Sequence, residues 1–152
     1  MIIVRNAIDY KKPIPDNEVV FFTSNSTLNN KGELVMGAGN ALAMKEAYPQ
    51  APKMFADMVK LYPSRRIHIT NPSLCGGMIG SFQTKIHWRN PTPLNILMES
   101  IRQLNIISML YTKITYHLPC PAINHGGMKE EDVLKLLDEL PNNVLVYIKP
   151  NN

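Results

Sequence analysis

Two short segments of this 152-residue chain place glycines directly before residues of helical composition. The first is Met36-Gly37-Ala38-Gly39-Asn40, which follows an apolar run. Glycine has no Cβ, so the backbone can turn sharply there and bring its N–H groups close to a ligand. The first N–H groups of a helix are free and carry a partial positive charge, which favours an anion. A nucleotide pyrophosphate is therefore the first ligand that this segment suggests.

Two well-known phosphate motifs are excluded at this segment. Position 42 is Leu, so the third glycine of the dinucleotide-binding fingerprint is missing. No Gly-Lys-Ser/Thr follows, which excludes a P-loop. On the first segment alone, an ordinary turn between a strand and a helix stays open as an alternative.

The second segment is Asn124-His125-Gly126-Gly127, which lies just before a helix expected to start near Lys129. Successive backbone amides in such a turn can form a nest for phosphate oxygens. His125 could donate to a phosphate or be a polar loop residue, and the sequence leaves both open. Two glycine-bearing loops that each open a helix are a stronger indication of an anion site than one.

A third segment, Ser81–Pro91, gathers polar and aromatic side chains at the end of a predicted strand. By itself, Lys85 is expected to be a solvated surface lysine, Trp88 to pack on the following helix, and His87 to be structural. The segment gains interest only if it lies beside a phosphate-binding crevice.

Strand and helix patterns alternate along the chain, which predicts a sheet with helices on both faces. In such sheets ligands bind beyond the carboxyl ends of the strands, so the two glycine loops could meet at one crevice. The predicted strands are Met1–Asn6, Glu18–Thr23, Arg66–Thr70, Met78–Lys85, Lys113–Leu118 and Val144–Ile148. The predicted helices are Asn40–Tyr48, Pro52–Leu61, Pro93–Leu104 and Lys129–Leu140.

Composition is that of a folded protein: 45% of residues are hydrophobic and 18% charged. We expect one domain over residues 1–152 and, because no leader or bilayer-spanning run occurs, a soluble cytoplasmic protein with no membrane partner. The net charge of +4 and the pI near 9.1 suit an anionic ligand. Cys75 and Cys120 lack metal-ligand spacing and are expected to be free buried thiols, so we predict no metal and no cofactor.

Four ordered blocks of the chain resemble the macrodomain family. They are Gly-Glu-Leu-Val-Met-Gly-Ala-Gly-Asn-Ala, Lys-Glu-Ala-Tyr-Pro, Phe-Gln-Thr-Lys-Ile-His-Trp-Arg and Ala-Ile-Asn-His-Gly-Gly-Met. The resemblance spans Phe21 to Ile148 and is strongest to the branch of the terminal ADP-ribose protein glycohydrolase and the antitoxin DarG. It implies an α/β fold: a three-layer α/β/α macrodomain with a mixed, mostly parallel sheet of about six strands.

The resemblance also implies the ligand and its contacts. The ligand would be ADP-ribose, free or attached to a macromolecule of which DNA is a candidate, and we expect a monomer. One binding set would comprise Asn25, Met36, Gly37, Ala38, Gly39 and Asn40, and a second Asn124, His125, Gly126 and Gly127. Lys85 matches the catalytic lysine of this branch. Gly126 stands where the glycohydrolase has an aspartate, as in DarG, which favours a DNA base over a protein carboxylate as the modified group.

The implied reaction is removal of ADP-ribose with the help of Lys85. A neutral Lys85 amine could attack the anomeric carbon, which requires a lowered pKa from burial beside Lys45, His87 or Arg89. A charged Lys85 could instead act as an acid or electrostatic partner of the leaving group. Three other functional assignments stay open. The protein could be a non-catalytic ADP-ribose binder or sponge, a phosphatase of ADP-ribose 1″-phosphate, or a Rossmann-like protein without an ADP-ribose role.

Overall fold

The computed structural model describes residues 1–72 and 76–150, so Cys75 lies outside the described residues. Six strands form one sheet in the order β1-β6-β5-β2-β4-β3. All neighbouring pairs are parallel except β3 and β4, which are antiparallel. The strands are β1 (Ile2–Val4), β2 (Glu18–Ser24), β3 (Ile67–Thr70), β4 (Met78–Gln83), β5 (Thr115–Pro119) and β6 (Val144–Tyr147). The predicted mixed, mostly parallel sheet is thus confirmed.

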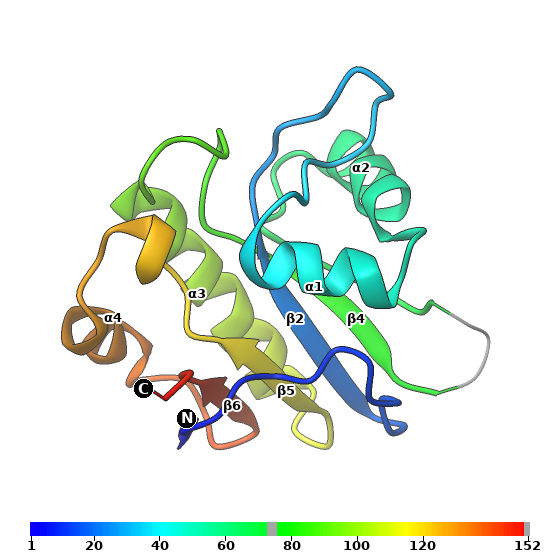
Figure 1. The fold of residues 1–152 in the computed structure, drawn as a ribbon. Helices are drawn as coiled ribbons and strands as arrows, with labels where there is room; N and C mark the ends of the chain where they lie inside the picture. The colour runs from blue at the N-terminus through cyan, green and yellow to red at the C-terminus, as the bar shows by residue number, and fades with distance from the viewer. Residues whose placement is uncertain (73–75, 151–152) are drawn as a thin grey trace.

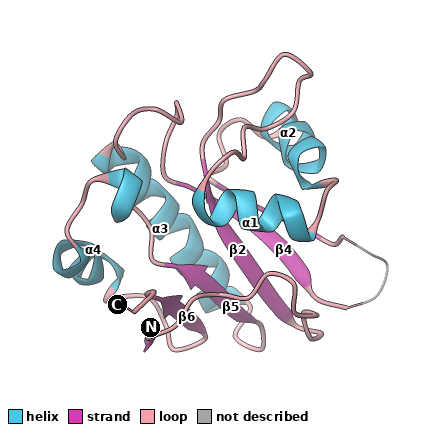
Figure 2. Ribbon diagram, in the orientation of Figure 1, coloured by secondary structure: helices cyan, strands magenta, loops and turns pink. Residues whose placement is uncertain are grey.

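Helices cover both faces of this sheet, giving three layers (Figures 1 and 2). The helices are α1 (Gly39–Ala47), α2 (Ala51–Leu61), α3 (Leu94–Leu110) and α4 (Glu130–Leu137), and a 3₁₀ turn, η1, spans Asn124–Gly126. The alternation of β2 shows why two helical layers are needed. Phe21 packs into the core beneath α3 and α4, while Phe22, one residue later, packs into the core beneath α1 and α2.

The C-terminal half of α3 differs from the expectation. The helix was predicted to end at Leu104 but continues to Leu110. Ser108 is buried and donates to Leu104 O at 2.7 Å, and Asn143 Nδ2 donates to Ser108 O at 2.9 Å. A distant side chain therefore satisfies a free carbonyl near the helix end, which local sequence does not reveal.

Three strand ends define where a ligand can bind. The strands β5, β2 and β4 are parallel neighbours, so their carboxyl ends share one edge of the sheet. Asn25, Thr84 and Cys120 are the residues that follow these strands. All three predicted functional segments therefore leave the sheet at the same edge.

Candidate functional site

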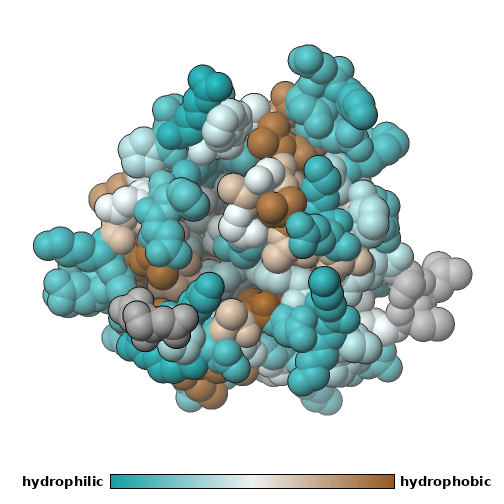
Figure 3. Space-filling view, viewed as in Figure 1, coloured by the Kyte–Doolittle hydropathy of each residue, from teal (hydrophilic) through white to brown (hydrophobic). Residues whose placement is uncertain are grey.

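A cleft of about 660 Å³ opens at this carboxyl edge. In the view of Figure 3 a recess lies near the centre of the molecule, with hydrophilic side chains on its left and both hydrophobic and hydrophilic ones on its right. Its walls come from the end of β2, the start of α1, the loop between β4 and α3, and the loop after β5. The lining residues are Thr23, Ser24, Asn25, Val35, Gly37, Ala38, Gly39, Asn40, Ala41, Thr84, Lys85, Trp88, Arg89, Thr92, Cys120, Ala122, Ile123, Asn124, His125 and Gly126.

The first wall is the start of α1. Gly39, the first helical residue, has φ +58°, a left-handed value that glycine adopts without strain. No side chain in the described ranges caps this helix end, and its first turn carries no acidic residue. The first-turn amides therefore present a partial positive charge beside the cleft.

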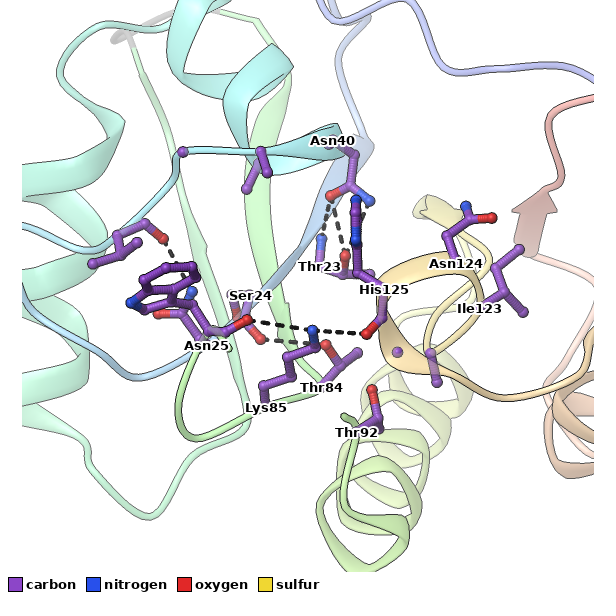
Figure 4. A pocket seen from close by; sticks show the side chains of 18 of the residues that line it. Thr23, Ser24, Asn25, Asn40, Thr84, Lys85, Thr92, Ile123, Asn124 and His125 are labelled. Carbon is purple, nitrogen blue, oxygen red and sulfur yellow. Dashed lines mark hydrogen bonds between the residues drawn. The ribbon is translucent and has the colours of Figure 1, made fainter. Parts of the chain in front are cut away.

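Asn40 ties the first wall to the sheet. Its Oδ1 accepts a hydrogen bond from Thr23 N at 2.7 Å, and its Nδ2 donates to Thr23 Oγ1 at 3.0 Å (Figure 4). The side chain predicted to bind ligand thus connects α1 to the end of β2. Because the Asn40 side chain is bonded to Thr23, the groups of this turn that are left for a ligand are mainly backbone groups.

Asn25 likewise uses its side chain on the protein. Its Nδ2 donates to Val35 O at 3.1 Å and its Oδ1 accepts from Thr27 N at 2.9 Å. The neighbouring Ile86 O accepts from Ser26 N at 3.1 Å and from Thr27 Oγ1 at 3.0 Å. These bonds join the loop after β2 to the segment that carries Lys85.

The second wall is the loop after β5, whose backbone is tightly wound. Ala122 and Asn124 have positive φ of 66° and 58°, and Gly127 has 79°. Met128 N donates to Ala122 O at 2.9 Å and Gly126 N donates to Ile123 O at 3.1 Å, closing the turn. Positive φ at non-glycine residues is uncommon, and Asn tolerates it best.

Lys85 connects the end of β2 to the second wall. It follows β4, and its N–H donates to Ser24 O at 3.3 Å. Its Nζ donates to His125 O at 3.0 Å and to Trp88 O at 3.4 Å (Figure 4). The groups that these contacts give to Nζ are carbonyl oxygens, so Lys85 is more than a solvated surface lysine.

Buried polar contacts fix the end of β4 beneath Lys85. Gln83 Nε2 donates to Lys85 O at 2.9 Å and Arg66 Nη1 donates to Gln83 Oε1 at 3.1 Å. Ser100 Oγ, from α3, donates to Gln83 O at 2.6 Å. These hydrogen bonds tie Gln83 at the end of β4 to Arg66, just before β3, and to Ser100 on α3, and so they hold the backbone at Lys85 in place.

Trp88 does not pack on the following helix as expected. It is 45% exposed, its ring stacks with that of His87 at 5.8 Å between centroids, and the Arg89 guanidinium lies 4.8 Å from the Trp88 centroid. Both Trp88 and Arg89 line the cleft. Within the described part of the chain the lining holds Lys85 and Arg89 but no Asp or Glu, so the cleft suits an anion.

The structure brings most of the predicted binding residues to one cleft, but not all. Met36 is buried, 3% exposed, in the core beneath α1 and α2. Gly127 is exposed beside the second wall and donates its N–H to Asn124 O at 3.1 Å. Neither residue contributes to the lining. Both were predicted to bind the ligand because they adjoin the two glycine turns in the sequence.

Sequence reasoning missed several lining residues, among them Thr23, Thr84 and Thr92. Their position at strand ends and in the loop before α3 was a usable signal, but threonine is too common to stand out. Cys120 was expected to be a buried thiol, and it is free, 7% exposed, and lines the cleft. Burial raises the pKa of this thiol to about 12.

Two further observations concern metal ligands and membrane spans. Among residues 1–72 and 76–150, no group of three or more His, Cys, Asp or Glu side chains is arranged to hold a metal ion. None of the helices within those ranges is both long and apolar enough to cross a membrane.

The fold is that of the macrodomains. The macrodomain of Mycobacterium tuberculosis DarG superposes with a TM-score of 0.74 at 24% identity, covering 99% of both chains. The macrodomain of Thermus aquaticus DarG gives a TM-score of 0.76 at 22% identity, covering 99% of this chain and 97% of that one. A structure of Thermosipho africanus DarTG in complex with ADP-ribose gives 0.70 at 18% identity over 85% of this chain and 37% of that one. No protein-family model and no curated protein matches the sequence.

Proposed function

We propose that this protein binds ADP-ribose in the cleft and hydrolyses the bond between ADP-ribose and a modified macromolecule, with Lys85 as the catalytic residue. The observation that carries this proposal is the position of Lys85 Nζ, 3.0 Å from His125 O in a cleft whose opposite wall is the start of α1. A group that could act on a glycosidic bond thus lies in the same cleft as two candidate phosphate-binding turns.

The pyrophosphate fits between the two walls. On one side are the first-turn amides of α1, and on the other the amides of Asn124 and His125, since the Gly126 amide already donates to Ile123 O. Both sets are backbone donors that need no side chain, and helix starts and nests favour anions. Macrodomain structures supply independent support, because one similar structure is a complex with ADP-ribose.

For the chemical step we favour Lys85 as an acid. Two carbonyl oxygens accept hydrogen bonds from Nζ, which leaves a third donor of an ammonium group for the leaving group. As the bond from the anomeric carbon to the carrier breaks, the lysine proton passes to the carrier atom. Water adds to the anomeric carbon and its proton returns to lysine.

The cleft favours a nucleic-acid base as the carrier. Trp88 is 45% exposed beside the cleft, with the Arg89 guanidinium on its ring at 4.8 Å. Exposed aromatic rings stack bases, and arginine attracts the phosphates that follow them. Gly126 supplies no carboxylate where the protein-directed glycohydrolase has one, which is the second reason to place DNA before protein.

The decisive experiment is a substrate panel. ADP-ribosylated single-stranded DNA, ADP-ribosylated protein and ADP-ribose 1″-phosphate are incubated with wild type, Lys85→Ala and Lys85→Arg. We expect release of ADP-ribose from DNA, a loss of about 10²–10⁴-fold in Lys85→Ala, and no rescue by Lys85→Arg because its proton is held too tightly. Lys113→Ala, at an exposed surface lysine, is the matched control.

The outcomes separate the alternatives. Activity in Lys85→Ala equal to wild type rejects the lysine mechanism. A wild type that binds ADP-ribose tightly in calorimetry but releases nothing from any substrate is a binder or sponge. Phosphate release from ADP-ribose 1″-phosphate alone identifies the phosphatase. A wild type that does not bind millimolar ADP-ribose rejects the macrodomain activities together.

A second measurement distinguishes the two roles of Lys85. If the amine attacked the sugar, an imine would form and cyanoborohydride would trap ADP-ribose on the protein. We expect no such adduct by mass spectrometry during turnover. An adduct that maps to Lys85 would establish the nucleophile instead of the acid.

A further inference from the structure

Thr92 is a cleft residue whose hydroxyl has no role within the protein. It lies between β4 and α3, lines the cleft, and donates its backbone N–H to Gly126 O at 3.2 Å. Its Oγ1 is buried, yet it has no hydrogen-bond partner among the residues that the structure describes. Buried hydroxyls nearly always have partners, so an unpaired one beside a cleft indicates a group supplied from outside.

Thr92 occupies the space that a side chain at position 126 would need. A Cβ on Gly126 would lie 2.8 Å from Thr92 Oγ1 and 3.4 Å from Ala122 Cβ. Side chains do not approach one another so closely, so a side chain at position 126 would force Thr92 Oγ1 or the turn to shift. Figure 4 shows the Thr92 hydroxyl directed towards this second wall. The loop before α3 therefore adds a polar side chain, Thr92, to this side of the cleft beside Asn124 and His125.

Thr92 lies at the same end of the cleft as Lys85, because both residues contact the turn after β5. Lys85 Nζ donates to His125 O, and Thr92 N donates to the carbonyl of the next residue, Gly126. The two residues thus contact consecutive peptide groups of one turn. Asn124 and His125 are exposed on this turn, whereas Thr92 Oγ1 is buried behind it, so a contact between a ligand and this hydroxyl requires the turn to shift.

The chemistry of a hydroxyl decides which part of the ligand it contacts. Phosphate oxygens need donors only, whereas a ribose hydroxyl both donates and accepts, as does Thr92 Oγ1. The sugar at the Lys85 end is the one whose anomeric bond is cleaved. We infer that Thr92 Oγ1 hydrogen-bonds a hydroxyl of this distal ribose and selects ligands that carry it. The inference rests on the proposed ADP-ribose site.

The test compares two ligands that differ by that ribose. Calorimetry measures the affinities of ADP-ribose and ADP for wild type, Thr92→Val and Thr92→Ser. Valine keeps the shape beside Gly126 and removes the hydroxyl, and serine restores it. We expect Thr92→Val to weaken ADP-ribose about 10-fold, the loss of one hydrogen bond, and to leave ADP within about 2-fold. Thr92→Ser should stay within about 2-fold of wild type for both, as should the exposed-site control Thr112→Val.

Each result decides the matter. Equal affinity of wild type and Thr92→Val for ADP-ribose rejects the contact while leaving the proposed function intact. An equal loss for ADP and ADP-ribose shows that Thr92 acts on the shape of the cleft and also rejects it. If wild type binds neither nucleotide, the proposed function falls first and this inference with it.

A kinetic readout sharpens the assignment. On ADP-ribosylated DNA we expect Thr92→Val to lower kcat/KM at least as much as ADP-ribose affinity, since the distal ribose is where charge develops. A kcat/KM unchanged within about 2-fold, with lowered ADP-ribose affinity, would show a contact made only with the product and would overturn the role in substrate selection.

Discussion

The two walls of the cleft use glycine in opposite ways. In the first wall a Cβ on Gly37 would meet nothing within 4 Å in the described part of the chain, and one on Gly39 would meet nothing either. In the second wall a Cβ on Gly126 would lie 2.8 Å from Thr92 Oγ1. The first wall therefore has open space beside Gly37 and Gly39, whereas in the second wall protein atoms crowd the space beside Gly126.

This difference separates binding from folding. Substitution of Gly37 in the first wall should affect affinity while sparing stability, and substitution of Gly126 in the second should affect stability even without ligand. The same contrast holds for the side chains: Asn40 connects the first wall to β2, while backbone hydrogen bonds close the second wall. The following predictions test the contrast, beginning with the largest effect.

Gly37→Val should abolish binding and leave folding intact. Its side chain would project into the open space of the first wall, so we expect ADP-ribose affinity to fall by at least about 100-fold. The free energy of unfolding should stay within about 0.5 kcal/mol of wild type, because no described atom is displaced. Calorimetry and urea denaturation measure the two quantities, with Gly37→Ala as the milder control. A strongly destabilised variant that still binds would reverse the assignment of the first wall.

Gly126→Ala should destabilise the fold without any ligand. Overpacking of this kind costs about 1–3 kcal/mol. In a Thr92→Ala background the clash with Oγ1 is removed, so the same substitution should cost about 1 kcal/mol less. Urea denaturation of the two single variants and the double variant gives this coupling directly. Strictly additive effects would mean that the loop avoids the clash by moving.

Two substitutions of Asn40 should have different effects, one mainly on the free energy of unfolding and the other mainly on ADP-ribose affinity. Asn40→Ala leaves Thr23 N without its acceptor and should cost about 1 kcal/mol of unfolding free energy. Asn40→Asp keeps an acceptor but brings a negative charge to the start of α1, so it should retain stability and weaken ADP-ribose several-fold. Paired denaturation and calorimetry test this. Equal affinity of Asn40→Asp and wild type would argue against a pyrophosphate at this helix start.

Cys120 should be unreactive although it lines the cleft. Burial, followed by the charge of Glu130, raises its pKa to about 12, so the thiolate that alkylating reagents attack is scarce at pH 8. In a Cys75→Ser background, iodoacetamide should label the folded protein far more slowly than the protein in urea, as read by mass spectrometry. The unfolded thiol loses its proton first, near pH 9, so Cys120 lowers stability only above that pH. Rapid labelling at pH 8 would contradict this burial.

Much of this arrangement follows from local sequence patterns. The strands β2, β4 and β5 and the glycine turns that come after β2 and β5 were predictable because apolar alternation and glycine position are local signals. The end of α3 was not, because it depends on Asn143, far away in the chain. The exposure of Trp88 and the unpaired hydroxyl of Thr92 were not predictable either, since both depend on how separate loops pack beside α3.

The carbonyl of Ile86 makes the loop at residues 27–33 useful as a reporter. Hydrogen bonds to Ile86 O hold the start of this loop, and its end is held by the bond from Leu34 N to Pro52 O at 2.9 Å. Its tip, at Asn30 and Lys31, is exposed and outside the cleft lining. A fluorophore attached at Lys31 would lie on a loop that is hydrogen-bonded, through Thr27, to the residue after Lys85. Its signal could therefore follow occupancy of the cleft without the dye competing for the space.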